Sequence, residues 1–147
     1  PLLYGRYIDD VLGITYGSES DVRYFVDKFN SLVPSITLSI QQIGNTVHYL
    51  DITIYKGKRF FEKGIFDLKT YQKPLNNCNY IPFTSSHSEN IKKNFISEEL
   101  RRYIKSCSDK KFFIFMKMAF FNRLRKRGYP KSFLSSIFQS VQYPLEN

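Results

Sequence analysis

Tyr7-Ile8-Asp9-Asp10 is the stretch around which this chain is organised, and it lies close to the N-terminus. Residues 2–6 before it and 11–16 after it are β-prone, which predicts a β-hairpin with the two carboxylates at its tip. Adjacent anions repel each other, and a bound cation usually offsets this cost. Mg²⁺ takes hard oxygen ligands from one or two carboxylates and therefore suits the pair, with a solvated acidic turn as the alternative.

The positive charge of the chain is concentrated in one stretch. The net charge is +9, and residues 92–131 alone carry +10, with 13 Lys and Arg against three acidic residues. The other residues hold nine basic and ten acidic side chains. Such asymmetry predicts a polyanionic partner whose binding is driven largely by counterion release.

Length and composition narrow the class of protein. The chain has 147 residues, 17% of them aromatic, which allows one domain with a core or two small lobes. Cys78 and Cys107 are isolated, which favours free thiols, and His48 and His87 are too few for a His-based metal site. Without a signal peptide or an apolar run of ~18 residues, we expect a soluble intracellular protein, in the nucleus or cytoplasm, with no membrane partner. The sequence leaves the oligomeric state open.

The N-terminal part is predicted to combine strands with one helix. Ser18 and Asp21 form a variant of the capping box, and an apolar stripe follows until Pro34, which predicts a helix between them. Asp51 alternates with buried strand positions, so we expect it to face solvent or to cap the neighbouring Lys-rich turn. Strands are predicted over residues 36–41, 46–55, 59–62 and 65–71, with breaks at Gly44-Asn45 and Gly64.

A polar, Asn-rich segment over residues 73–82 leads into a helical part. Helices are predicted over residues 88–92, 97–107 and 108–127 and from Pro130 to Val141. The predicted fold class is therefore α+β. An antiparallel sheet with a packed helix occupies residues 1–73, and an all-helical bundle occupies residues 83–143.

The end of the third predicted helix is crowded with cations, namely Arg123, Arg125, Lys126 and Arg127. Cations at a helix C-terminus complement the macrodipole by ~0.3–1 kcal/mol each, but one or two would fill that role. Gly128-Tyr129-Pro130 and a further helix follow, which is the outline of a helix-turn-helix that could dock on a duplex. We therefore predict nucleic-acid contact here, with a solvated helix end as the alternative.

Several motifs occur in the order found in one family. Tyr-x-Asp-Asp between two short strands resembles the catalytic hairpin of reverse transcriptases, and the later motifs resemble those of Penelope-like and related animal retroelements. The resemblance covers roughly residues 4–135 and departs from the family at Gln72, Leu75 and Ser88, outside the metal site. The later motifs lie at residues 48–55 (HYLDITIY), 70–76 (TYQKPLN), 85–88 (SSHS) and 127–130 (RGYP).

This resemblance implies the last part of a palm and a basic thumb from an RNA-directed DNA polymerase. Asp9 would be the catalytic metal ligand and Asp10 would support it, with Mg²⁺ or Mn²⁺ as cofactor in the complete enzyme. Tyr7 would lie near the primer end, with a half-buried sheet tyrosine as the alternative. The partners would be an RNA/DNA primer-template and deoxynucleoside triphosphates.

The polymerase site needs a further carboxylate from an earlier strand, and no residue precedes Pro1 to supply it. We therefore expect that the chain begins within a domain and is inactive as an isolated fragment. The alternative function is a non-catalytic nucleic-acid-binding module left from a decayed retroelement.

The predicted nucleic-acid contacts lie from residue 73 onward. Lys73 and His87 could touch phosphate or sugar, although each is also an ordinary surface residue. A thumb grips the backbone rather than the bases, since a copying enzyme must not prefer a sequence. The other basic residues predicted to bind nucleic acid are Lys92, Lys93, Arg101, Arg102, Lys105, Lys117, Arg123, Arg125, Lys126, Arg127 and Lys131.

Overall fold

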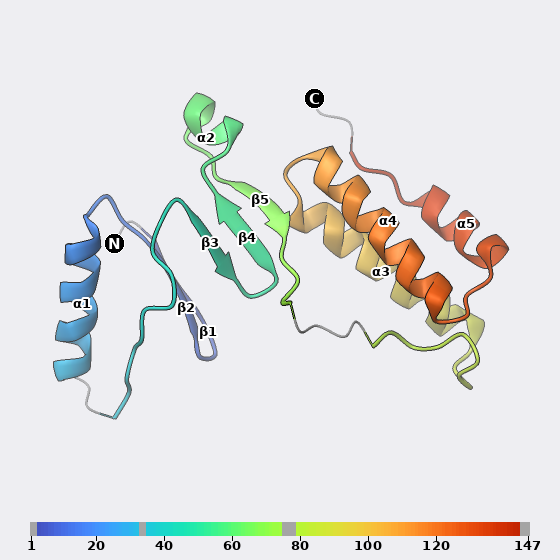
Figure 1. Cartoon of the computed structure of the whole chain (residues 1–147), viewed down its shortest axis with the longest axis horizontal. Helices are drawn as coiled ribbons and strands as arrows, with labels where there is room; N and C mark the ends of the chain where they lie inside the picture. The colour runs from blue at the N-terminus through green and yellow to red at the C-terminus, as the bar shows by residue number, and fades with distance from the viewer. Residues whose placement is uncertain (1–2, 33–34, 75–78, 145–147) are drawn as a thin grey trace.

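The computed structural model describes residues 3–32, 35–74 and 79–144 (Figure 1). Antiparallel strands dominate the N-terminal part and helices form the C-terminal part, which confirms the predicted α+β class. The elements are β1 (Leu3–Tyr7), β2 (Asp10–Ile14), α1 (Glu19–Leu32), β3 (Thr46–Tyr49), β4 (Ile52–Tyr55), α2 (Lys58–Lys63), β5 (Asp67–Thr70), α3 (Glu89–Ser106), α4 (Lys110–Lys126) and α5 (Lys131–Ser140). β1 and β2 form one sheet, and a second sheet has the order β3-β4-β5.

Helix α1 begins with the predicted capping box. The Ser18 N–H donates to Asp21 Oδ2 at 2.8 Å, and the Asp21 N–H donates to Ser18 Oγ at 3.3 Å. The hydrogen bonds from Ser18 hold the pKa of Asp21 below its ordinary value. The predicted stop at Pro34 lies outside the described residues. No residue of α1 is buried, and Figure 1 shows the helix at the end of the molecule opposite the C-terminal helices.

Residues 36–41 do not form the predicted strand. The side chain of Asn30 takes both backbone groups of Leu38, because its Nδ2 donates to the Leu38 carbonyl at 3.0 Å and its Oδ1 accepts from the Leu38 N–H at 2.8 Å. In a strand, a neighbouring strand would pair with these groups. The alternating sequence pattern is present, but it does not reveal this competition.

Residues 46–55 were predicted as one strand, and that prediction is wrong. They form the antiparallel hairpin β3–β4, in which Tyr49 pairs with Ile52 and the turn consists of Leu50 and Asp51. Leu50 takes a left-handed φ of 54°, a conformation that Leu rarely adopts. The turn contains neither Gly nor Asn, so of the common turn residues it has only Asp51.

Residues 59–62 were also predicted as a strand, and they form the helix α2 instead. Gly57 precedes this helix at a place where an added Cβ would collide with the carboxylate of Asp67. Gly64 ends the helix with φ 70°, as the predicted break requires. Strand β5 then forms within the predicted range 65–71 and pairs with β4.

The helical part begins with one long helix where two were predicted. Helix α3 runs without a break through Ser97, and the Ser88 Oγ at its start accepts from the Ile91 N–H at 3.4 Å. Buried Ile96 and Leu100 lie on either side of Ser97, so core packing continues the helix past a residue that often caps one. Helix α4 begins after Asp109, whose carboxylate accepts from the Lys111 N–H at 2.8 Å, as predicted.

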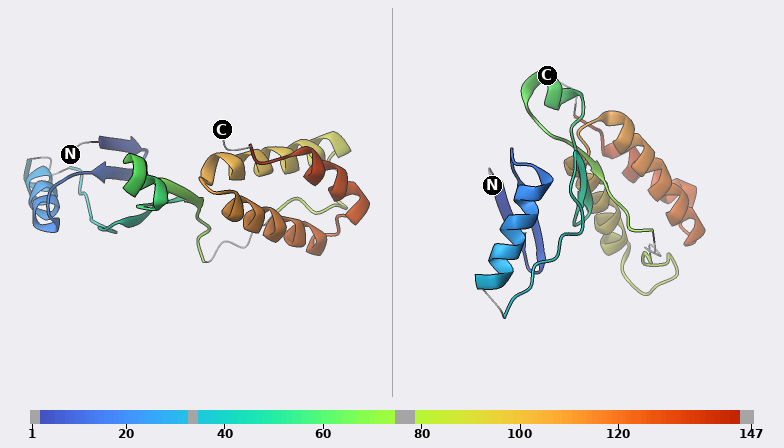
Figure 2. Two further views of the ribbon diagram at one scale, coloured as in Figure 1. Left: turned by 90° about the horizontal axis from the view of Figure 1, so that it is seen from above. Right: turned by 60° about the vertical axis from the view of Figure 1, so that its left-hand side comes forward.

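Helix α5 runs back along α4 (Figures 1 and 2). Phe138 of α5 packs edge-on against Phe121, with ring centroids 5.1 Å apart. Farther along, Lys117 Nζ donates to the Val141 carbonyl at 2.8 Å, and Tyr143 Oη donates to the Cys107 carbonyl at 2.8 Å. The two helices therefore form an antiparallel pair joined by a tight turn.

The apolar core lies in the helical part and is centred on Phe120 of α4. Its ring meets those of Tyr80, Tyr103 and Phe138 at centroid distances of 4.9, 5.8 and 5.9 Å. Of the described residues before α3, only Thr53 and Asp67 are buried. The buried apolar residues are Ile96, Leu100, Tyr103, Cys107, Phe113, Met116, Phe120, Leu124, Tyr129, Leu134, Ile137, Phe138 and Val141.

Candidate functional site

Asp9 and Asp10 lie at the tip of the β1–β2 hairpin, as predicted. Tyr7 pairs with Asp10, so Ile8 and Asp9 are the turn residues, and both carboxylates are exposed. Ile8 has a φ of 51°, in the left-handed region that costs ~1–2 kcal/mol for a residue with a Cβ. The guanidinium of Arg6 supports the turn, since its Nε donates to the Ile8 carbonyl at 2.8 Å.

The two carboxylates have the chemistry of a hard-cation site but supply only part of a ligand set. Between described residues, no ion pair involves Asp9 or Asp10. The described part of the chain also holds no cluster of three or more His, Cys, Asp or Glu side chains. Such a pair suits Mg²⁺, which keeps several waters and takes substrate oxygens as further ligands.

A second turn repeats the geometry of the first. Leu50 and Asp51 occupy the β3–β4 turn as Ile8 and Asp9 occupy the β1–β2 turn, with φ values of 54° and 51° for the two aliphatic residues. In Figure 1 both hairpins turn toward the lower edge of the molecule. The carboxylate of Asp51 forms an ion pair with Arg102 of α3, a contact that neither sequence alternative anticipated. The repeated Tyr-aliphatic-Asp spacing was the sequence signal for this turn.

Arg102 connects that turn to the helical part through a second carboxylate. Its guanidinium donates to both oxygens of Glu99, at 2.8 and 2.9 Å. Burial raises the pKa of Glu99, but the hydrogen bonds and charge of Arg102 outweigh it, so the pKa lies below its ordinary value. Those hydrogen bonds to Glu99 also raise the pKa of Arg102. Arg102 was predicted to bind nucleic acid, and its charge is instead engaged by two acidic residues.

Ser108 joins the second sheet to the helices. Its Oγ accepts from the Leu68 N–H and from Arg59 Nη2, both at 2.6 Å, and its N–H donates to the Leu68 carbonyl at 2.8 Å. Beside it, the hydroxyls of Thr70 and Ser106 lie 2.5 Å apart. Strand β5 is therefore bonded along its length to the connection between α3 and α4.

Arg59 belongs to the same joint through a buried carboxylate. Its Nε donates to Asp67 Oδ1 at 2.6 Å, and the Asp67 side chain is only 9% exposed. Sequence reasoning missed this joint, because Arg59 and Ser108 are 49 positions apart and neither lies in a motif.

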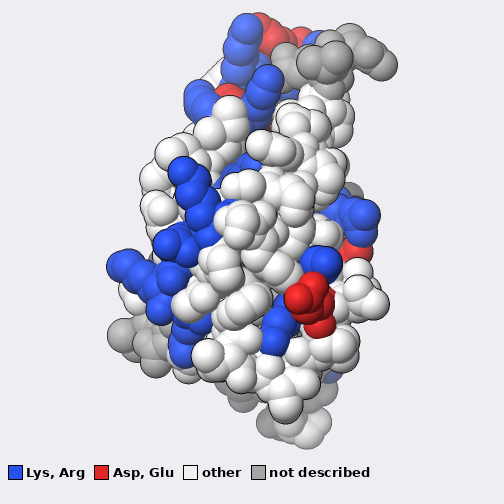
Figure 3. Space-filling view, turned by 90° about the vertical axis from the view of Figure 1, so that its right-hand side faces the viewer, with Lys and Arg blue, Asp and Glu red and all other residues white. Residues whose placement is uncertain are grey.

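The exposed cations of the helical part form the candidate nucleic-acid interface. Figure 3, which faces the helical end of the molecule, shows Lys and Arg side chains gathered along one side of that face. Lys105, Lys126 and Lys131 are exposed and form no ion pair with a described residue. Lys93 and Arg101 are exposed but paired, with Glu89 and Glu98 respectively. Arg125 is exposed too.

Some of the residues predicted to bind nucleic acid are hydrogen-bonded to groups within the folded chain. Lys92 is 6% exposed, and its ammonium donates to the carbonyls of Phe83 and Ser85, each at 2.8 Å. A buried ammonium cannot reach a phosphate, so the prediction for Lys92 is wrong. The ammonium of Lys117 is held by the Val141 carbonyl and lies 5.5 Å from the ring centre of Phe113, and burial lowers its pKa.

The four cations at the end of α4 have different surroundings. Arg123 donates to Gln72 Oε1 at 2.6 Å, and Arg127 donates to Asn79 Oδ1 at 2.5 Å, so both hold the segment before α3. Arg125 donates to the Tyr129 carbonyl at 2.5 Å. Of the four, Lys126 is the side chain whose ammonium makes no hydrogen bond to a described residue.

The turn between α4 and α5 is built around a buried tyrosine. Tyr129 is 0% exposed, and its hydroxyl donates to the Ile81 carbonyl at 2.9 Å. Gly128 has a φ of 87°, which a residue with a Cβ rarely adopts. The predicted Gly-Tyr-Pro turn is therefore present, and it also anchors the segment that enters the bundle.

The remaining predicted residues are exposed. Tyr7 is 57% exposed, more than a half-buried sheet tyrosine would be. Lys73 is exposed, and His87 is exposed with its Nδ1 3.2 Å from Ser85 Oγ. The structure does not bring Lys73 or His87 into a shared cluster with the acidic turn.

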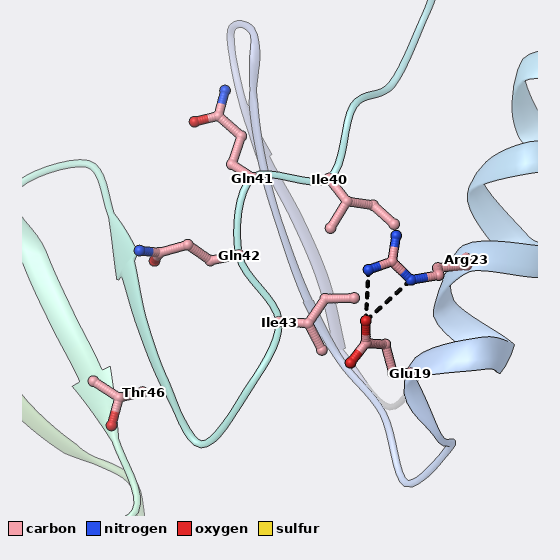
Figure 4. A pocket seen from close by; sticks show the side chains of 7 residues that line it. All are labelled: Glu19, Arg23, Ile40, Gln41, Gln42, Ile43 and Thr46. Atoms are coloured by element: carbon pink, nitrogen blue, oxygen red, sulfur yellow. Dashed lines mark hydrogen bonds and ion pairs between the residues drawn. The ribbon is translucent and has the colours of Figure 1, made fainter.

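A polar hollow of about 400 Å³ lies between α1 and residues 40–46 (Figure 4). Glu19 and Arg23 of α1 form its charged wall, with the Arg23 Nη2 2.5 Å from Glu19 Oε1. Gln41 and Gln42 extend from the opposite segment in Figure 4. None of the predicted site residues lines this hollow.

Comparison with known proteins bears on the helical part. Residues 79–139 match the family model of the animal helix-turn-helix domain, a match that covers less than half of the chain. It agrees with the predicted helix-turn-helix outline and supports nucleic-acid binding by this part. No curated protein and no solved structure matches the chain significantly. None of the described helices is both long enough and apolar enough to cross a membrane.

Proposed function

We propose that the chain is the C-terminal part of an RNA-directed DNA polymerase from a Penelope-like or related retroelement, acting in the nucleus or cytoplasm. The observation that carries this proposal is the exposed Asp9–Asp10 pair, which forms no ion pair with a described residue and lies at the tip of a strained hairpin. A strained turn that displays two anions side by side has a clear use if a metal ion binds them. The basic helical part then holds the primer-template.

Each part of the chain has its own role in this proposal. Asp9 and Asp10 hold Mg²⁺ or Mn²⁺, which would stabilise the attacking primer hydroxyl and the leaving oxygen of a deoxynucleotide during nucleotidyl transfer. Arg6 keeps the turn in its left-handed conformation through the Ile8 carbonyl. Lys105, Lys126 and Lys131 contact backbone phosphates of the primer-template. Other oxygen ligands would complete the coordination of the metal ion.

A second candidate is a nucleic-acid-binding module without catalysis. The helix-turn-helix match and the exposed cations favour it directly, whereas both carboxylates of the metal site are needed only for the enzyme. The two candidates share the binding surface and differ in whether Asp9 has a chemical role.

Primer extension separates the candidates. The assay uses poly-rA with oligo-dT and a longer polypeptide that carries the sequence upstream of residue 1. Asp9→Asn should abolish extension and leave primer-template affinity nearly intact, because the metal acts on the transition state. Asp27→Asn, an exposed acidic position on α1, is the matched control and should retain activity. If Asp9→Asn keeps more than about a tenth of the rate, a loss under ~1.4 kcal/mol, Asp9 is not a metal ligand.

A further inference from the structure

An open groove between β5 and the start of α4 lies outside both the acidic turn and the cations assigned to the nucleic-acid interface. It encloses about 450 Å³, within the size range of ligand pockets. Figure 1 shows β5 ending close to the beginning of α4. The groove is lined by Lys69, Thr70, Lys111, Phe112, Phe115 and Met116.

The groove combines aromatic rings with ammonium groups. Lys69 Nζ lies 5.6 Å and Lys111 Nζ lies 5.2 Å from the ring centre of Phe112, so one ring is flanked by two cations. Lys111 also has a carboxylate of Asp109 at 3.1 Å, an exposed pair that contributes little. Phe112 is braced by the edge of Tyr55, with centroids 6.4 Å apart.

Phe115 is the ring of this groove that makes no ring contact with another described residue. It is 70% exposed, and Met118, one turn farther along α4, is 62% exposed. Together with Lys111 and Asn122 they follow one another at intervals of four, three and four residues, so they share one outer face of the helix. This face begins with a cation, continues with two apolar side chains and ends with an amide.

We propose that this groove and the outer face of α4 bind unpaired bases of a single-stranded nucleic acid. Bases stack on exposed aromatic rings whatever their sequence, and Lys69 and Lys111 lie where the phosphates of the same strand would need cations. The chain's net charge of +9 favours a polyanionic partner over a neutral one. This inference rests on the proposed nucleic-acid binding and adds a single-strand site to a duplex-binding surface.

The test measures the affinity of the whole chain for two short labelled single strands by fluorescence anisotropy. The strands have equal length, and one carries bases whereas the other is abasic at every position. Phe115→Ala should weaken binding of the base-bearing strand about 5- to 100-fold and leave the abasic strand unchanged. Phe61→Ala is the matched control, because Phe61 is 79% exposed on α2, away from the groove, and it should change neither affinity. Lys69→Gln should weaken both strands alike, since both carry phosphates.

Equal binding of both strands by the unchanged chain, or an unaltered affinity after Phe115→Ala, would overturn the inference. Binding of phosphatidylcholine–phosphatidylserine vesicles that depends on Phe115, without base-dependent strand binding, would also overturn it. Duplex binding measured in parallel keeps the proposals distinct. If duplex affinity persists while the bases make no difference, this inference fails and the proposed function stands.

Discussion

Ile8 is a β-branched residue in a left-handed turn, and the strain it carries predicts the effect of replacing it. Ile8→Gly removes the steric cost of φ 51°, although Gly also makes the unfolded chain more flexible. The steric term is larger, so we expect amide protons of β1 and β2 to exchange several-fold more slowly in the variant. Gly5→Ala is a suitable control because no atom beyond Gly5 and its two chain neighbours lies within 4 Å of the added Cβ. Faster exchange in Ile8→Gly would mean that the Ile8 side chain itself holds the hairpin.

Glu99 gives a prediction about pH. Its pKa is lower in the folded chain than in the unfolded one, so its contribution to stability is present above the unfolded value of about 4.3 and is lost as pH falls through the folded value. Glu99→Gln should therefore lower the free energy of unfolding by roughly 1–3 kcal/mol at pH 7. The difference from the unchanged chain should shrink steadily below about pH 4.

Glu98 supplies the control for Glu99, since the two residues are neighbours on α3. Glu98 is 68% exposed and pairs with the exposed Arg101, and such pairs contribute little. Urea denaturation of both variants between neutral and acidic pH checks the prediction. A Glu99→Gln difference that stays constant across this range would show that lost packing, not the charge, is responsible.

Among the elements, strand β5 depends on Ser108 for its attachment to the helices. Ser108→Ala leaves the Leu68 N–H without its side-chain acceptor. It also removes one of the two acceptors of Arg59 Nη2, which still donates to the Phe66 carbonyl. We expect the free energy of unfolding to fall by about 1–3 kcal/mol. Denaturant unfolding monitored by circular dichroism measures this loss. Ser132→Ala, at an exposed position of α5, should change it by less than ~0.5 kcal/mol. Equal effects of the two variants would contradict the role of Ser108 as a joint.

Several helix ends followed from the sequence, whereas three of the predicted strands did not. The caps at Ser18 and Asp109 and the stop at Gly128 are local chemistry, so composition predicted them. The strands over residues 36–41, 46–55 and 59–62 failed because pairing depends on distant partners. Asn30 replaces one such partner, and a turn without Gly splits another segment.

The candidate site also has one part that the sequence predicted and one part that it did not. The acidic turn was predictable, because the carboxylates and their flanking strands are adjacent in sequence. The sequence could not predict which cations stay exposed without a partner, because folding brings distant carbonyl and amide groups next to some of them. Lys92 is buried under Phe83 and Ser85, and Arg123 is bonded to Gln72, 51 positions away.

For the whole molecule, the central claim is that exposed cations of the helical part bind nucleic acid through phosphates. The logarithm of the binding constant for duplex DNA should fall linearly with the logarithm of salt concentration. If about four to six of the 13 basic residues in residues 92–131 engage phosphates, the slope is roughly −4 to −5. Fluorescence anisotropy over a salt series measures this slope directly.

The decisive measurement is that slope in two variants of equal charge. Changing Lys105, Lys126 and Lys131 together to Gln removes exposed cations of the helical part, whereas changing Lys28, Lys58 and Lys63 to Gln removes exposed cations of the N-terminal part. We predict that the first variant has a slope about 2–3 units shallower, at ~0.9 per phosphate, and that the second keeps the slope of the unchanged chain. Identical slopes in all three proteins, with circular dichroism showing the fold intact, would contradict the claim.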